Sequence, residues 1–206
     1  AAGAGAGFSG INGSSASVTG SGRAKRYRVQ LPAGSSRFTL HYAGRVDFGF
    51  DTPGQEYARG FSETAGTIRD DGVYLAGSTL WYPYLGDTLF TFELAASAPP
   101  GWQLISPGNG SARDATGVAR WRSDTPLDEL HIVGGPLQRY ARAAGAVTAE
   151  VYLRKGDDAL AARFLEATAR NLEMYRSLIG VYPYDKFALV ENFWETGYGM
   201  PSFTLL

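Results

Sequence analysis

Residues 157–190 read DDALAARFLEATARNLEMYRSLIGVYPYDKFALV, and no other stretch of the chain is as informative. Its large apolar residues recur at helical spacing and lie near one face: Leu160, Phe164, Leu172, Tyr175 and Ile179. Asp157 or Asp158 can cap the start of this helix, and Gly180 can end it. A turn follows, and the apolar run at 187–190 predicts a short buried strand.

The chain before this stretch has the pattern of a β protein. Between Tyr27 and Leu153, short apolar–polar alternations are separated by turn-rich segments. The segments that predict strands are RFTLHYAGRV (37–46), TLFTFEL (88–94), WQLIS (102–106), GVARWRS (117–123), ELHIVGG (129–135) and AVTAEVYLR (146–154). The segments 102–106 and 117–123 flank a turn-rich loop, so they are expected to pair as a hairpin. Many short strands of this kind predict a mainly β fold, with antiparallel sheets packed as a sandwich.

These patterns divide the chain into three segments. Residues 1–22 are almost entirely Gly, Ala, Ser and Asn, which predicts a flexible lead-in. Residues 23–155 are predicted to form a β-sandwich domain, and residues 156–206 to begin a second, α/β domain. The clearest change of character lies between Arg154 and Asp157.

Composition and charge exclude several classes of function. The net charge of −1 gives no overall field that would attract nucleic acid or an anionic membrane. No apolar run is long enough to span a bilayer. The absence of cysteine excludes disulfides, thiolate zinc sites and a cysteine nucleophile. It does not fix the compartment, so an exported or periplasmic location stays open.

No complete catalytic constellation can be assembled from this sequence. The two histidines, His41 and His131, lie in different strand-like segments, and neither is followed by the glutamate of an H-E-x-x-H zinc motif. No G-x-S-x-G nucleophile elbow occurs. Glu191 and Glu195 are four residues apart, but the glycine and aromatic residues around them argue against a shared helix face. Neither a catalytic residue nor a metal ligand is therefore predicted in this chain.

Three stretches of the sequence carry a resemblance to a known family. They are NLEMYRSLIGVYPYDKFALVENF (171–193), HIVGGPLQRY (131–140) and GVYLAGSTLWYPYL (72–85). In this order and spacing they resemble zinc aminopeptidases of the aminopeptidase N and leukotriene A hydrolase type, in a divergent bacterial branch. The first resembles that family's helix, Tyr-Pro-Tyr turn and strand, and the second resembles a strand and Gly-Pro turn of its β domain. The resemblance covers residues 27–206.

The resemblance implies a saddle-like β-sandwich domain followed by a thermolysin-like catalytic domain. Residues 156–206 would then be the first helix and strand of that catalytic domain. In the family, H-E-x-x-H and a downstream glutamate hold zinc, which polarises the scissile carbonyl and activates water. We expect those residues to follow Leu206 in a larger parent enzyme, so that zinc belongs to the parent and not to this chain.

The resemblance also predicts a substrate-binding strand in ENFWETGYGMPSFTLL (191–206). The family's G-A-M-E-N segment lies on an edge strand that pairs with extended peptide substrate, and its glutamate binds the free α-amino group. The matching residues here are Tyr198, Gly199, Met200, Pro201 and Ser202. Proline stands at the glutamate position, so the usual amino-group anchor is missing there. Glu195 or Glu191 could replace it through a different loop path.

A non-catalytic β-sandwich module is the alternative interpretation. It would use aromatic residues such as Trp81, Tyr82 and Tyr84 to hold a glycan or a peptide, or would act as an interaction domain. A free-standing sandwich has no need of a long amphipathic helix followed by a buried strand. If the family resemblance holds, residues 157–206 should expose apolar surface or drive self-association.

Overall fold

The computed structural model describes residues 7–8, 16–19, 26–50, 64–84, 86–111 and 113–206. The chain forms two compact units, residues 1–47 and residues 48–206. In the first unit, β1 (Gly7–Phe8) pairs with β4 (Tyr42–Ala43), and β2 (Ala16–Thr19) pairs with β3 (Arg26–Val29), both antiparallel. Two of these strands thus fall within the expected lead-in, most of which lies outside the described residues.

The strand expected over residues 37–46 is wrong in extent, because only Tyr42–Ala43 forms strand there. Phe38 and Tyr42 are exposed large apolar residues, so the alternation in this segment does not face a packed core. Alternation predicts a strand only where one face is buried against another layer.

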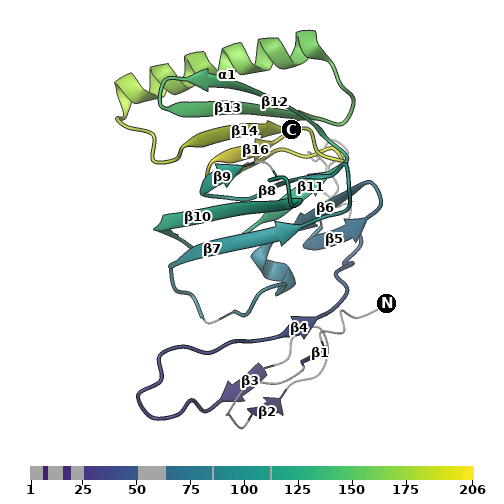
Figure 1. Ribbon diagram of the computed structural model, residues 1–206, viewed down its shortest axis with the longest axis vertical. Helices are drawn as coiled ribbons and strands as arrows, with labels where there is room; N and C mark the ends of the chain where they lie inside the picture. Colours follow the sequence, from purple (N-terminus) through teal and green to yellow (C-terminus); the bar gives the residue numbers. More distant parts are fainter. Residues whose placement is uncertain (1–6, 9–15, 20–25, 51–63, 85, 112) are drawn as a thin grey trace, which may run out of the picture. The chain divides into compact units, whose positions relative to one another are not determined.

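The second unit contains three sheets in its described part (Figure 1). The first is antiparallel, in the order β5 (Gly66–Arg69), β6 (Gly72–Leu75), β11 (Ile132–Gly135), β8 (Gln103–Ile105). The second is antiparallel, in the order β7 (Phe90–Ser97), β10 (Val118–Leu127), β9 (Asn109–Ser111). The third is mixed, in the order β12 (Gln138–Ala144), β13 (Val147–Leu153), β14 (Lys186–Val190), β16 (Phe203–Leu205), β15 (Tyr198–Met200). A short 3-10 helix, η1, spans Gly77–Thr79.

The hairpin expected between residues 102–106 and 117–123 is also wrong. β8 pairs with β11, whereas β10 takes β9 from inside the predicted loop as its partner. Gly108 and Gly110 both have positive φ angles, 83° and 107°, which favour glycine. A Cβ at Gly110 would collide with the Arg120 carbonyl, so the close approach of these strands depends on glycine.

Helix α1 (Asp158–Leu178) connects two parallel strands, β13 and β14, as a crossover. The side chain of Asp157 caps its start by accepting a hydrogen bond from the Leu160 amide at 2.9 Å. One face of the five-stranded sheet packs against this helix, with Val151 and Leu153 against Ala161 and Leu165. Figure 1 shows α1 lying across β12 and β13. The helix and the strand predicted from residues 157–190 are both confirmed.

The opposite face of the five-stranded sheet packs against the four-stranded sheet. The shared core consists of Tyr74, Ala76, Ile105, Val133 and Leu137 on one side and Tyr152, Ala188, Val190, Phe203 and Leu205 on the other. These elements are therefore layered, with α1 first, then the mixed five-stranded sheet, then the four-stranded antiparallel sheet. Strands from both sides of the proposed boundary at residue 156 take part in the mixed sheet.

The apolar stripe of α1 is buried along only part of the helix. Ala161, Leu165 and Thr168 are buried, but Tyr175 is exposed and Ile179 is 81% exposed. The exposed large apolar residues at this end of the helix are Met174, Tyr175, Leu178, Ile179 and Val181, which we term the helix-end patch. Apolar surface is thus exposed at the helix end, while β14 and β16 are largely buried. Self-association through this segment stays a prediction.

The expected mainly β architecture is confirmed. Within the described ranges, no helix combines the length and the hydropathy needed to cross a bilayer.

Candidate functional site

Strand β15 forms one edge of the mixed sheet and carries the predicted substrate-binding residues. Among the described strands it pairs only with β16, with Tyr198 opposite Leu205, Gly199 opposite Thr204 and Met200 opposite Phe203. Its other side presents backbone amide and carbonyl groups that an added extended chain can pair with.

Gly199 lies at the centre of this edge and is exposed. Its φ angle is not positive, and a Cβ at this position would meet no atom within 4 Å. The fold therefore does not require glycine here, and no described atom fills the space that a side chain at this position would occupy. Tyr198 and Met200 are half-buried and pack against the core shared by the two sheets.

Ser202 lies inside the protein rather than at the open edge. It is 3% exposed and has a φ angle of 70°, in the left-handed region that non-glycine residues rarely adopt. Its Oγ accepts a hydrogen bond from Lys186 Nζ at 2.6 Å and donates one to the Gly108 carbonyl at 3.1 Å. Ser202 therefore fixes the turn between β15 and β16, and its side chain is directed away from the open edge.

Lys186 is the buried cation behind this turn, and only 2% of its surface is exposed. Burial lowers the pKa of Lys186 to about 8, against the opposing effects of Glu150 and Asp185. Glu150 is buried beside it on β13 and accepts hydrogen bonds from Arg139 at 2.6 Å and from the Tyr152 hydroxyl at 2.9 Å. Burial raises the pKa of Tyr152, and the Glu150 charge adds to that effect.

Raising the pH from 8 to 10.5 should stabilise the chain relative to a Lys186→Met variant. The pKa of Lys186 is about 8 in the folded chain and 10.5 as its ordinary value, so the unfolded chain binds more protons between these pH values. The free-energy cost of burying the charged ammonium is fully present below pH 8, and it is absent above pH 10.5, where the amine is neutral in both the folded and the unfolded chain. The difference in unfolding free energy should therefore move by on the order of 2 kcal/mol in favour of the wild type. Urea unfolding of both proteins across this range checks it, and a flat difference would contradict it.

The two glutamates considered as amino-group anchors lie on the segment between β14 and β15. The Glu191 carboxylate accepts a hydrogen bond from the Arg154 amide at 2.7 Å, and the Glu191 amide donates to the Tyr152 carbonyl at 2.9 Å. Glu191 thus fastens the end of β14 to the end of β13. Glu195 is exposed. Pro201 is half-buried in the turn, where it has neither charge nor amide hydrogen to offer.

An aromatic cluster that the sequence analysis did not identify lies beside β15. The Trp194 ring is 4.6 Å from Phe193, 5.1 Å from Tyr74 and 5.3 Å from Phe50, and Tyr198 stacks on Tyr74 at 6.4 Å. The adjacent aromatic residues Phe193 and Trp194 were the one feature of the sequence that could have indicated this cluster. Its ring partners come from distant segments, which a sequence pattern does not reveal.

The aromatic residues singled out from the sequence take a structural role at two positions. The rings of Trp81 and Tyr82 are 5.0 Å apart, and Tyr82 also lies 5.9 Å from Phe90. The Tyr82 hydroxyl accepts a hydrogen bond from the Leu130 amide at 3.1 Å. Tyr84 is exposed.

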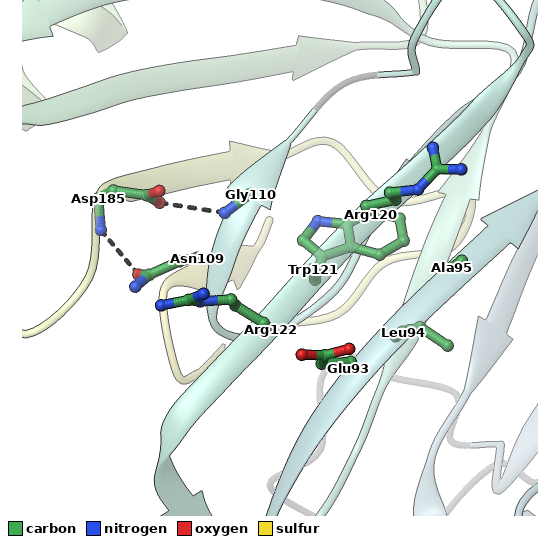
Figure 2. Close-up of a pocket in the computed structure, with 9 residues that line it drawn as sticks. All are labelled: Glu93, Leu94, Ala95, Asn109, Gly110, Arg120, Trp121, Arg122 and Asp185. Carbon is green, nitrogen blue, oxygen red and sulfur yellow. Dashed lines mark hydrogen bonds between the residues drawn. The ribbon is translucent and has the colours of Figure 1, made fainter.

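A separate cavity of about 660 Å³ lies on the three-stranded sheet (Figure 2). It is lined by Glu93, Leu94, Ala95, Asn109, Gly110, Arg120, Trp121, Arg122 and Asp185. Asp185 is fixed at its rim, accepting from the Gly110 amide at 3.2 Å and donating its own amide to Asn109 at 2.9 Å. Arg120 and Arg122 form exposed ion pairs with Asp114 and Asp124. No residue of β15 lines this cavity.

The described residues do not fit a zinc site. Among them, no three His, Cys, Asp or Glu side chains are grouped as a metal ion would require. His131 is buried and lies 3.4 Å from Glu129, and His41 belongs to the other unit. Burial lowers the pKa of His131, with Glu129 and then Asp128 acting in the opposite direction.

The chain is similar in structure to M1 zinc metallopeptidases. The enzyme from Deinococcus radiodurans matches with a TM-score of 0.65 at 19% identity, over 97% of this chain and 49% of that chain. An aminopeptidase N family protein from Idiomarina loihiensis (TM-score 0.60, 17% identity) and native LTA4 hydrolase from yeast (TM-score 0.59, 13% identity) each match 97% of this chain and 33% of their own. A mutant of the Deinococcus enzyme is known with a Tyr-Ser-Ala substrate bound.

No protein-family model matches this chain, and no curated protein matches it in sequence. At identities of 13–19% the structural likeness establishes the fold alone. That fold is the N-terminal part of the M1 metallopeptidases, so the fold class implied by the resemblance is confirmed. The chain spans between a third and a half of the length of these neighbours.

Proposed function

We propose that this chain, which has the fold of the N-terminal part of M1 zinc metallopeptidases, contributes that part to an aminopeptidase-like peptidase. Its role is to shape the substrate cleft and to supply the edge strand β15. Zinc is the metal of the solved neighbours, and the described residues here form no site for it. We therefore assign no catalytic step to this chain, and its partner is an extended peptide substrate.

The open side of β15 is the observation that supports this function. A strand with one free backbone edge binds extended peptide by hydrogen bonds that do not depend on side-chain identity. Gly199, at its centre, leaves room for a second backbone to approach closely. Tyr198, Met200 and Pro201 complete the proposed binding segment, and Ser202 holds its turn from within.

Pro201 sets the proposed specificity. Without a carboxylate at this position, the free amino terminus of a substrate loses its charge-assisted partner there. Both candidate replacements, Glu191 and Glu195, are exposed, but the Glu191 carboxylate already accepts a hydrogen bond from the Arg154 amide. Glu195 is therefore the better candidate for an amino-group anchor. A weak preference for free over acetylated amino termini would agree with the loss of the usual anchor.

Gly199→Val tests the edge strand directly. In the protein encoded by the complete reading frame, zinc-dependent cleavage of Tyr-Ser-Ala is expected, and the substitution should raise KM about tenfold or more. A Cβ at position 199 meets no atom of the described fold, and a β-branched side chain there would crowd the face of β15 over which a bound peptide has to lie.

Ala141→Val is the matched control for this experiment. Ala141 is exposed on β12, at the opposite edge of the same sheet, so its substitution should leave KM unchanged. Equal KM values for the two variants would contradict the role of β15. A complete protein with no zinc-dependent peptidase activity would contradict the proposed function as a whole.

A non-catalytic binding module is the second candidate function. The cavity on the three-stranded sheet favours it, because two arginines, a glutamate and an asparagine line it together. Binding of a glycan or peptide that Glu93→Ala abolishes, in a complete protein without peptidase activity, would support this alternative.

A further inference from the structure

One buried ammonium group joins three segments that are far apart in the sequence. Lys186 Nζ, on β14, donates a hydrogen bond to the Ser106 carbonyl at 3.0 Å and another to Ser202 Oγ at 2.6 Å. Ser202 Oγ in turn donates to the Gly108 carbonyl at 3.1 Å. The segment between β8 and β9, strand β14 and the turn between β15 and β16 therefore meet at one point.

A lysine hydrogen-bonded to a serine could suggest an acyl-transfer nucleophile, but the environment argues against it. A nucleophilic serine must reach the substrate and transfer its proton to a base. Ser202 is 3% exposed, and its hydroxyl already donates to the Gly108 carbonyl. The pair is built to hold backbone rather than to react.

We propose that Lys186 is a positioning residue for the edge strand β15. Ser202 has a left-handed backbone, which is unfavourable for a residue with a Cβ and persists only where its surroundings hold it. Ser202 immediately precedes β16, and the Ala188 amide on β14 donates to its carbonyl at 3.1 Å. Fixing Ser202 therefore fixes the turn, the register of β16 on β14 and the placement of β15.

The chemistry of the side chain supports this role. A buried ammonium is unfavourable unless it is paired and hydrogen-bonded, and an apolar residue of similar length would fill the space at lower cost. Only a group with several donors reaches the Ser106 carbonyl and Ser202 Oγ together. The charges that favour protonated Lys186 are those of Glu150 and Asp185, both acidic.

The absence of cysteine in the chain allows a direct test. In Lys186→Cys, the single thiol is alkylated in denaturant, either to an S-aminoethyl group or to an S-propyl group, and the protein is refolded. The two adducts have the same size and differ only in the terminal amine. We expect the Ala188 and Phe203 amides to exchange hydrogen about tenfold more slowly in the aminoethyl protein.

Amides of the β12–β13 pair serve as the internal control, and their exchange should be equal in both adducts. Equal protection of Ala188 and Phe203 in the two proteins would overturn the proposal. If neither adduct refolds, Lys186→Met and the wild type are compared in the same way, with the same expected difference and the same contrary result. This measurement needs no enzymatic activity.

The effect of Lys186 on substrate binding rests on the proposed function. In the complete protein, Lys186→Met should raise KM for Tyr-Ser-Ala and leave kcat nearly unchanged, because a displaced edge strand weakens ground-state and transition-state binding alike. A mere loss of folded protein would lower the apparent kcat at constant KM, which would contradict a positioning role. Slower exchange in the aminoethyl adduct, with no peptidase activity, would retain the positioning role and reject the proposed function.

Discussion

Glu150→Gln should lower the free energy of unfolding by about 3–5 kcal/mol, because it breaks a buried charge pair from one side. The carboxylate is 1% exposed and accepts hydrogen bonds from Arg139 and from the Tyr152 hydroxyl. Lys186 depends on the same charge, since Glu150 favours its protonated form. Glutamine keeps the shape but leaves Arg139 without its anionic partner and removes one of the two acidic charges that favour protonated Lys186.

Asp124→Asn is the matched control for this prediction. It removes an acid from the Arg122–Asp124 pair, in which both side chains are largely exposed. Exposed pairs contribute little, so its effect should stay below about 0.5 kcal/mol. Urea unfolding at pH 7 measures both variants. Similar small losses for both would show that Glu150 does not act as the central anion of the core.

Phe203→Ala is expected to have an effect of similar size, about 3–5 kcal/mol, for a different reason. The ring is fully buried in the core shared by the mixed five-stranded sheet and the four-stranded antiparallel sheet. Its removal leaves a cavity under β16, and β15 depends on β16 for its backbone pairing. Under the proposed function, the peptidase activity of the complete protein should be lost together with stability.

Leu178→Ala provides the comparison for the core substitution. Leu178 belongs to the helix-end patch and is 72% exposed, so the change should lie within about 0.5 kcal/mol of the wild type. Denaturant unfolding of the two variants under the same conditions checks the pair. A loss at position 178 as large as that at position 203 would mean that the patch is buried in solution.

Local patterns were sufficient where one physical effect dominates a segment. The helix over residues 158–178 follows from apolar spacing and the Asp157 cap, and the strand at 186–190 follows from a short apolar run after a turn. The strand over residues 90–97 follows from alternation, which its burial repeats residue by residue. In each case the signal lies within a few residues of its effect.

Local sequence patterns were insufficient where a segment far along the chain decides which face is buried or which strands pair. The apolar spacing correctly predicted the helix and its exposed apolar surface, but it could not show that the sheet covers only the beginning of α1. The hairpin prediction failed because β9, within the expected loop, has the glycines that allow it to approach β10. A sequence does not state which face another layer will cover.

For the candidate site, too, the local sequence indicated some features, and contacts between distant segments decided the others. From the sequence, the family resemblance predicts that residues 198–202 are the substrate-binding segment, with proline at the position of the family's glutamate. Only the tertiary structure placed Ser202 inside the protein, hydrogen-bonded to Lys186 sixteen residues away in sequence. It also brought Tyr74 against Trp194 and Tyr198 beside the strand.

The sequence by itself determined the mainly β character, the helix–turn–strand unit and the residue types that the edge strand can offer. The tertiary structure decided which of those residues face an open edge, which are buried, and where the buried charges find their partners. The physical reason is the separation along the chain over which each interaction acts. Backbone propensity, capping and alternation act between neighbours, whereas burial and charge pairing depend on contacts formed when distant segments pack together.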